Sequence, residues 1–194
     1  MIISGTEQDF TTTVKKALTE IDPNWENYNG IIVVGSHSND LIEQKIQLLK
    51  EGRENNIPTL GICHGMQLMA VEFARNVLGI PDATSEEFGT GTNLVTKMPG
   101  FRVGLKEVPW FGTLLQGNTL ESHWHQYKVN PLYWGSFNRS GWFFGVNVND
   151  EVAETMVLTG HPFYMGTQFH PEYQNSVDKP HIVLTEFLKA CKSK

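Results

Sequence analysis

The sequence is poor in cysteine and has no long apolar run. Its 194 residues include only two cysteines, Cys63 and Cys191. That pair does not resemble a disulfide framework and fits a reducing compartment. No apolar stretch approaches the roughly 20 residues needed to cross a membrane, and the first residues lack the charge pattern of a signal peptide. These absences predict a cytoplasmic protein.

Positive charge is also in short supply. The chain has 15 lysines and arginines against 21 aspartates and glutamates, a net charge of −6 and a pI near 5.6. This balance argues against nucleic acid or an anionic membrane as the main partner. The 40% hydrophobic content is ample for one core, so we expect a single domain over residues 1–194.

The first half of the chain alternates between strand and helix patterns. After a short strand at Ile2 and Ile3, apolar residues every three or four positions predict a helix that ends at Pro23. The β-branched run 30–35 is typical of a strand buried on both faces of a parallel sheet. Asp40 is expected to cap the next helix. This order predicts a doubly wound α/β sheet that binds ligands at the carboxyl ends of its strands.

The second half favours short strands. We expect antiparallel hairpins along one edge of the sheet, formed by residues 119–123, 142–146, 154–158 and 164–169. Residues 81–109 have little periodicity and are expected to form a loop region over the site. A final amphipathic helix carries Cys191 as a packing residue. The fold class expected is α/β, with a mostly parallel central sheet flanked by helices and an antiparallel edge.

Cys63 occupies a turn between a predicted strand and a predicted helix. Gly61 and Gly65 flank it in the pattern Gly-x-Cys-x-Gly, which is the thiol version of a nucleophile elbow. The helix N-terminus favours a thiolate at this turn, and the backbone N–H of His64 points where an oxyanion would form. On this pentapeptide alone, a buried and inert cysteine stays an alternative.

A second motif delivers a histidine and a carboxylate from one strand end. His170 and Glu172 are separated by the rigid Pro171. A thiol nucleophile needs a base to take its proton, and the base needs an acceptor that fixes its tautomer. Taken alone, this tripeptide is more typical of a structural loop. Together with the Cys63 turn, it favours a catalytic pair.

Residues 61–67 and 168–172 resemble the two signatures of the class I glutamine amidotransferases, and most closely those of the glutaminase domain of CTP synthase. Further similar stretches are 53–58, 72–77, 85–88, 101–104 and 121–130. The resemblance implies a flavodoxin-like fold and hydrolysis of a side-chain amide through a thioester on Cys63. In this scheme His170 acts as base and acid, and Glu172 orients it.

The chain departs from the family at the substrate pocket. Gly35 and Ser36 replace the family's Pro-Gly-Gly loop, so the second oxyanion N–H falls to Ser36, beside that of His64. Gln126 stands where the family has the arginine that holds the carboxylate of glutamine. Losing that charge-assisted pair costs roughly 1.5–3 kcal/mol. Glu87, which matches the residue that pairs with the amino group of glutamine, is retained.

Gly35, Gln67, Glu87, His123 and Gln126 are therefore the candidate substrate-binding residues. A protonated His123 or His125, or Arg102, is a candidate to replace the missing arginine. The alternative for the two histidines is a structural role, on one face of a strand where their hydrogen bonds are already satisfied.

Three functions stay open. The first is a glutaminase that delivers ammonia to a separate synthase subunit. The second is a stand-alone hydrolase of a γ-glutamyl or related small amide, which the altered Gln126 position favours. The third is a non-catalytic binding module, which the intact Cys63, His170 and Glu172 disfavour. No cofactor is expected, and the histidines lack the spacing of a zinc site. The sequence leaves a homodimer open.

Overall fold

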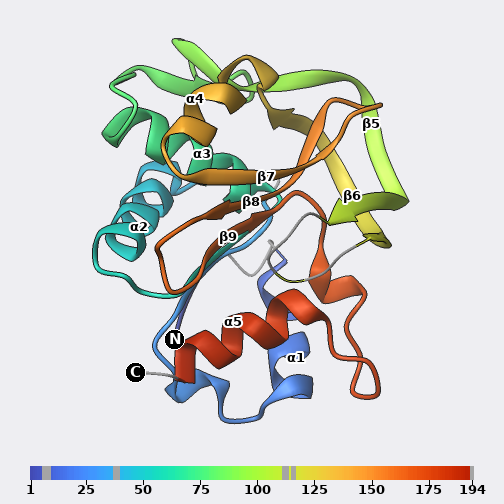
Figure 1. Cartoon of the computed structure of the whole chain (residues 1–194). Helices are drawn as coiled ribbons and strands as arrows, with labels where there is room; N and C mark the ends of the chain where they lie inside the picture. The colour runs from blue at the N-terminus through green and yellow to red at the C-terminus, as the bar shows by residue number, and fades with distance from the viewer. Residues whose placement is uncertain (6–9, 37–39, 111–113, 115–116, 193–194) are drawn as a thin grey trace.

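The computed structural model describes residues 1–5, 10–36, 40–110, 114 and 117–192. Figure 1 shows a central sheet covered by helices, with a long two-stranded ribbon to one side. The central sheet has six strands in the order β1-β2-β3-β9-β8-β7, and a second sheet has three in the order β4-β5-β6. No helix in the described parts of the chain is long and apolar enough to cross a membrane.

The central sheet has the predicted mixture of parallel and antiparallel strands. Its strands are β1 (Ile2–Ser4), β2 (Ile31–Val33), β3 (Thr59–Ile62), β7 (Trp142–Asn147), β8 (Val152–Leu158) and β9 (Tyr164–Thr167). β1, β2, β3 and β9 are parallel neighbours, while β8 and β7 continue the sheet antiparallel from β9. The α/β class and the antiparallel edge are therefore confirmed.

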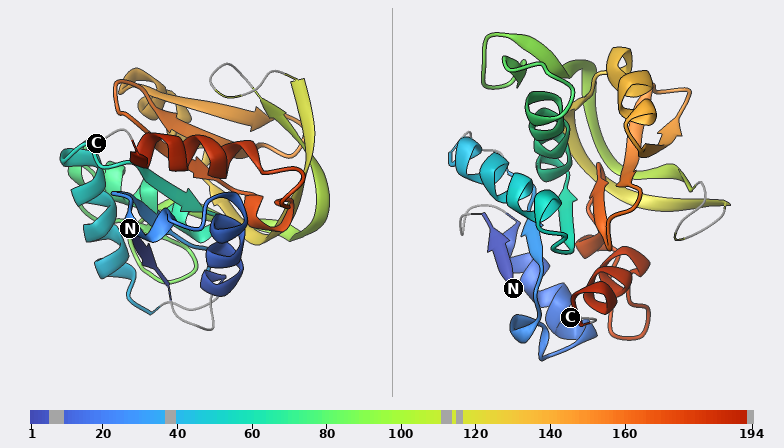
Figure 2. Two further views of the ribbon diagram at one scale, coloured as in Figure 1. Left: turned by 90° about the horizontal axis from the view of Figure 1, so that it is seen from below. Right: turned by 60° about the vertical axis from the view of Figure 1, so that its left-hand side comes forward.

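Helices cover both faces of this sheet, as Figure 2 shows from two further sides. They are α1 (Thr11–Ile21), α2 (Ile42–Glu54), α3 (His64–Asn76) and α5 (Ile182–Lys192), with the short α4 (Trp134–Arg139) beside β7. The β2 side chains alternate between two clusters. Ile31 and Val33 pack with α2 and α3, and Ile32 packs with α1 and α5. A strand buried on both faces needs the continuous apolar run that the sequence has there.

The loop predicted over residues 81–109 is wrong. This segment contains β4 (Ala83–Ser85) and β5 (Thr92–Trp110), and β5 pairs antiparallel with β6 (Gly117–Val129). Residues 119–123 consequently lie in the second sheet and not in an edge hairpin of the central one. Much of β5 is exposed on both faces, and its register shifts between Lys97 and Arg102. Its stability therefore comes from pairing with β6, and its sequence shows no alternation of apolar and polar residues.

The predicted cap of α2 is also wrong. Leu41, not Asp40, is the N-cap residue, and it makes no side-chain capping hydrogen bond. Its backbone is left-handed, with a φ of 61°. That conformation turns the chain into the helix one residue later than the capping pattern suggested.

A buried ion pair joins α2 to α3 and yields a stability prediction. Arg53 Nη2 lies 2.8 Å from Glu72 Oε1, and its Nε donates to Glu72 Oε2 at 3.0 Å. The Glu72 side chain is fully buried. Replacing Arg53 with methionine leaves that carboxylate without its charged partner, so that in the described part of the chain only the Asn76 amide still donates to it. The change is expected to lower the free energy of unfolding by about 3 kcal/mol, measured by urea denaturation.

Arg139→Met is the matched control, because among the described residues the Arg139 side chain makes an exposed hydrogen bond to Ser136 and no ion pair. It is expected to change stability by about 0.5 kcal/mol or less. Equal effects of the two variants would show that the Arg53–Glu72 pair does not stabilise the helix packing.

Candidate active site

Cys63 lies at a strained turn between β3 and α3. Its φ of 53° and ψ of −104° are values that residues with a side chain rarely adopt, and α3 begins at the next residue. The Cys63 N–H donates to the Thr167 carbonyl of β9 at 2.6 Å. Cys63 therefore sits at the carboxyl end of β3, in the predicted strand, turn and helix.

Glycine is required next to this turn. A Cβ atom added at Gly65 would lie 2.0 Å from the Val33 carbonyl oxygen of β2. The first turn of α3 thus packs directly against the backbone of the neighbouring strand. This close approach fixes where the N-terminus of α3 points, and with it the position of the Cys63 side chain.

His170 and Glu172 follow β9, the parallel neighbour of β3. The His170 Nδ1–H donates to Glu172 Oε1 at 2.7 Å, and the His170 ring is almost fully buried. The His170 backbone N–H donates to the Ser122 carbonyl of β6 at 2.8 Å, which ties this strand end to the second sheet. Because β3 and β9 run parallel, the histidine reaches the same edge of the sheet as Cys63.

The electrostatic surroundings of His170 favour its charged form. Burial alone disfavours an imidazolium, but the Glu172 carboxylate and the Cys63 sulfur overcome this and raise the pKa of His170 to about 10. The His170 Nε2 atom has no hydrogen-bond partner among the described residues. An imidazolium beside a thiol is suited to hold a thiolate and to protonate a leaving group.

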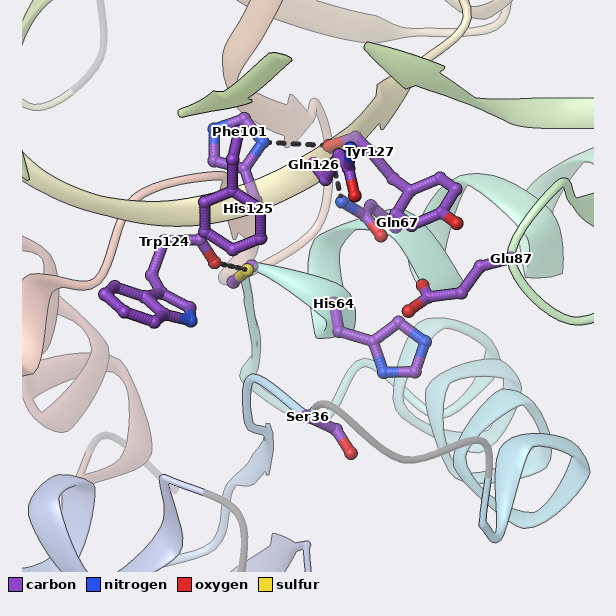
Figure 3. A pocket seen from close by; sticks show the side chains of 10 residues that line it. Ser36, His64, Gln67, Glu87, Phe101, Trp124, His125, Gln126 and Tyr127 are labelled. Carbon is purple, nitrogen blue, oxygen red and sulfur yellow. Dashed lines mark hydrogen bonds between the residues drawn. The ribbon is translucent and has the colours of Figure 1, made fainter. Parts of the chain in front are cut away.

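The Cys63 sulfur faces a cavity of about 250 Å³. It lies 3.8 Å from the Trp124 carbonyl oxygen, which accepts from the thiol (Figure 3). Gln168 Nε2 lies 3.7 Å from the sulfur. The described residues that line the cavity are Ser36, Cys63, His64, Gln67, Glu87, Phe101, Trp124, His125, Gln126 and Tyr127. A buried nucleophile beside a histidine and carboxylate, opening into a small polar cavity, is an arrangement for acyl transfer.

The pattern that defines the glutamine amidotransferase class-I family matches residues 4–190, nearly the whole chain. The chain belongs to the class I glutamine amidotransferases. This family confirms the predicted enzyme class, a glutamine amidotransferase-type enzyme acting on an amide C–N bond.

The similar proteins include several named CTP synthase. The chain is 40% identical over 185 residues to CTP synthase of Aquifex aeolicus and 35% identical over 184 residues to that of Methanoregula boonei. These matches cover 86% and 87% of this chain but only 35% of each relative, so the chain spans about a third of their length. Its fold matches the glutaminase domain of Trypanosoma brucei CTPS, solved with bound acivicin, with a TM-score of 0.87, 22% identity and coverage of 100% and 93%.

Most of the predicted site residues of this amidotransferase lie at one place. Ser36, His64, Glu87 and Gln126 line the cavity beside Cys63. Gln67 also lines it, but its Nε2 donates to the Tyr127 carbonyl at 2.9 Å. The Gln67 amide therefore connects α3 to β6 and helps to form the cavity wall.

Gly35 and His123 lie outside the described lining of the cavity. A Cβ atom added at Gly35 would lie 2.8 Å from His170 Cε1, so this glycine leaves room for the His170 ring. His123 Nδ1 lies 3.0 Å from Arg102 Nη1, and its Nε2 lies 3.7 Å from Glu154 Oε2. His123 thus belongs to a buried polar cluster with Arg102 and Glu154.

Sequence reasoning missed Phe101, Tyr127 and Gln168 as site residues. Phe101 lies in the segment taken for a loop, and the pairing of β5 with β6 brings it to Trp124, with ring centroids 5.5 Å apart. Gln168 lies two residues before His170, and its amide reaches Cys63. The signal available for Gln168 was its place at the start of the 168–172 motif; the register of β9 against β3, which brings it beside Cys63, is seen only in the structure.

The raised pKa of His170 gives a titration prediction. The imidazole is expected to stay protonated through pH 8 and to titrate near pH 10 in ¹⁵N NMR of the ring nitrogens. A native pKa above the unfolded value of about 6.5 stabilises the fold fully below pH 6.5. That contribution is lost as the pH rises toward 10.

Glu172→Gln removes a carboxylate that raises this pKa, so His170 should then titrate at a lower pH than in the wild type. An unchanged His170 titration in the Glu172→Gln variant would contradict the assigned cause.

Proposed function

We propose that this chain hydrolyses the side-chain amide of glutamine or a glutamine-like substrate through a thioester on Cys63. The observation that carries the proposal is the hydrogen-bonded His170–Glu172 pair, held beside the strained Cys63 turn by two parallel strands. A family match alone would not require these three side chains to converge. Their convergence, with a cavity in front of the sulfur, supports nucleophilic catalysis.

The reaction follows from the positions of these groups. The Cys63 thiolate attacks the amide carbon, and the backbone N–H groups of His64 and Ser36 stabilise the oxyanion. The His170 imidazolium gives its proton to the departing nitrogen, so ammonia leaves as the thioester forms. His170 then takes a proton from a water molecule as that water attacks the thioester. The carboxylic acid is released and the Cys63 thiolate is restored. Glu172 holds the His170 ring in the orientation that both steps need.

The names of the relatives suggest a use for the ammonia. The matched proteins are named CTP synthase. We propose that an ammonia-accepting synthase subunit is a partner of this glutaminase unit. We also place the reaction in the cytoplasm, where the free Cys63 and Cys191 thiols would stay reduced.

A second candidate is a stand-alone hydrolase of a γ-glutamyl or related small amide. Gln126 on the cavity wall favours it, because a neutral amide does not pair with the carboxylate of free glutamine as an arginine does. Both candidates use the same chemistry at Cys63. They differ in which amide reaches it.

Ammonia release by the purified wild type, with Cys63→Ala as the background, tests the proposed chemistry. Cys63-dependent release of ammonia together with the matching carboxylic acid is the expected result. Cys191→Ala is the matched control, because Cys191 is a buried packing residue whose pKa burial raises to about 12. Loss of activity in Cys191→Ala with activity kept in Cys63→Ala would overturn the assignment of the nucleophile.

A further inference from the structure

The described wall of the cavity beside Cys63 carries a carboxylate and no lysine or arginine to balance it. Glu87 is a carboxylate on its lining, and none of the described lining residues is a lysine or arginine. Outside the described part of the chain, the sequence contains only one lysine or arginine, Lys194. A substrate ammonium therefore has a partner here, and a substrate carboxylate lacks one.

Arg102 does not supply the missing charge. It neighbours the cavity residue Phe101 in the sequence, but its own side chain is buried and does not line the cavity. Its Nη2 lies 2.7 Å from Glu154 Oε1 and 3.3 Å from Asp150 Oδ2. The guanidinium is thus already paired with two carboxylates.

The histidines do not supply it either. Burial, together with the nearby Arg102 charge, lowers the pKa of His125 to about 3, so this lining residue is neutral at pH 7. His123 is neutral for the same reasons, with a pKa of about 2. The ring of His64 faces the Glu87 carboxylate in Figure 3. A positive charge on His64 would therefore pair with Glu87 and would not be free to hold a substrate carboxylate.

The rest of the wall suits a neutral, partly apolar group. Gln126 offers an amide, which can both donate to and accept from another amide. Phe101 and Trp124 stack edge to face and are 52% and 49% exposed, so they form an open aromatic rim. At about 250 Å³, the cavity is smaller than the roughly 300–1,000 Å³ of sites that enclose drug-sized ligands. The cavity therefore fits one amino-acid residue of a substrate, and the rest of that substrate would extend across the aromatic rim.

We propose that the preferred substrate is the side-chain amide of an N-terminal glutamine, in a peptide or a small glutaminyl amide. This inference rests on the proposed function and names its substrate class. The free α-ammonium pairs with Glu87, and the peptide bond meets Gln126 where free glutamine would bring a carboxylate. The following residue packs on Phe101 and Trp124. The products are ammonia and an N-terminal glutamate, with one water consumed.

Steady-state kinetics on glutaminyl-glycine, free glutamine and N-acetylglutamine test this substrate class. We expect kcat/KM for glutaminyl-glycine to exceed that for free glutamine by tenfold or more, and N-acetylglutamine, which lacks the ammonium, to be the poorest substrate. Mass spectrometry must identify glutamyl-glycine as the product. Cyclisation to pyroglutamate also frees ammonia but consumes no water, and the Cys63→Ala background removes its contribution.

Gln126→Arg is the decisive variant. It places a guanidinium on the cavity wall and should raise kcat/KM for free glutamine about tenfold or more. The kcat/KM for glutaminyl-glycine should change little. Gln47→Arg adds the same charge at an exposed site on α2, where Gln47 contacts Glu51, and should leave the preference unchanged. A preference that shifts equally in both variants would be a general charge effect and would overturn the inference.

The kinetic results distinguish a failure of the N-terminal glutamine inference from a failure of the proposed amide hydrolysis. If the wild type hydrolyses free glutamine as efficiently as glutaminyl-glycine, in a Cys63-dependent reaction, the N-terminal glutamine inference fails and the proposed function stands. If none of the three amides is hydrolysed in a Cys63-dependent reaction, the proposed function fails and the inference fails with it.

Discussion

Replacing His170 with alanine is expected to lower kcat for amide hydrolysis by about 10³- to 10⁴-fold. The loss has two physical causes. The Cys63 sulfur loses the imidazolium that would stabilise its thiolate, and the leaving nitrogen loses its proton donor. KM should change little, because His170 is not among the described residues that line the cavity. Fixed-time ammonia assays on the folded variant measure kcat and KM.

His181→Ala provides a matched control for the loss of a buried histidine. His181 Nε2 lies 3.1 Å from Glu121 Oε2, a second buried histidine–carboxylate pair that does not line the cavity. Its loss should reduce stability and leave kcat within a few-fold of wild type. An His170→Ala variant that is folded and keeps more than a tenth of the wild-type kcat would contradict the assigned role of His170.

Replacing Gly65 with alanine is expected to lower the free energy of unfolding by more than about 3 kcal/mol. The added Cβ would lie 2.0 Å from the Val33 carbonyl oxygen, and the clash is between two backbone segments with no flexible side chain to yield. Either α3 or β2 must move. The variant should therefore unfold at a much lower denaturant concentration, measured by circular dichroism in urea.

Gly100→Ala is the comparison for this substitution. A Cβ added at Gly100 meets no atom within 4 Å, so its effect should stay within about 0.5 kcal/mol. Similar stabilities of Gly65→Ala and Gly100→Ala would mean that the close packing of α3 against β2 is not needed for the fold.

Local signals were sufficient for the parts of the fold that carry Cys63. The apolar runs of β2 and β3 and the glycines around the turn specify a buried strand followed at once by a helix. Cys63 adopts the strained conformation that this pattern implies, with a φ of 53°. His170 and Glu172 lie two residues apart, so their hydrogen bond is also a local event. Short-range geometry of this kind leaves a readable pattern.

Long-range pairing was not readable in the same way. β5 gains its hydrogen bonds from β6, and only that pairing brings Phe101 to Trp124 and Arg102 to His123. Much of β5 is exposed on both faces and carries no two-residue alternation, so it looks like a loop, whereas residues 119–123 of β6 were recognised as a strand but assigned to the wrong sheet. The sequence likewise named His123 and His125 as candidate cations, and their burial beside Arg102, which keeps them neutral, follows from tertiary contacts alone.

The most direct test of the mechanism is to trap the acyl group during the first turnover. Wild-type protein is mixed with glutamine or glutaminyl-glycine and quenched in acid within one turnover, and its peptides are analysed by mass spectrometry. The expected result is a thioester on the peptide that contains Cys63, formed together with the first equivalent of ammonia and absent from Cys63→Ala. Release of that first equivalent without an acyl group on Cys63, or with the group on another residue, would contradict it.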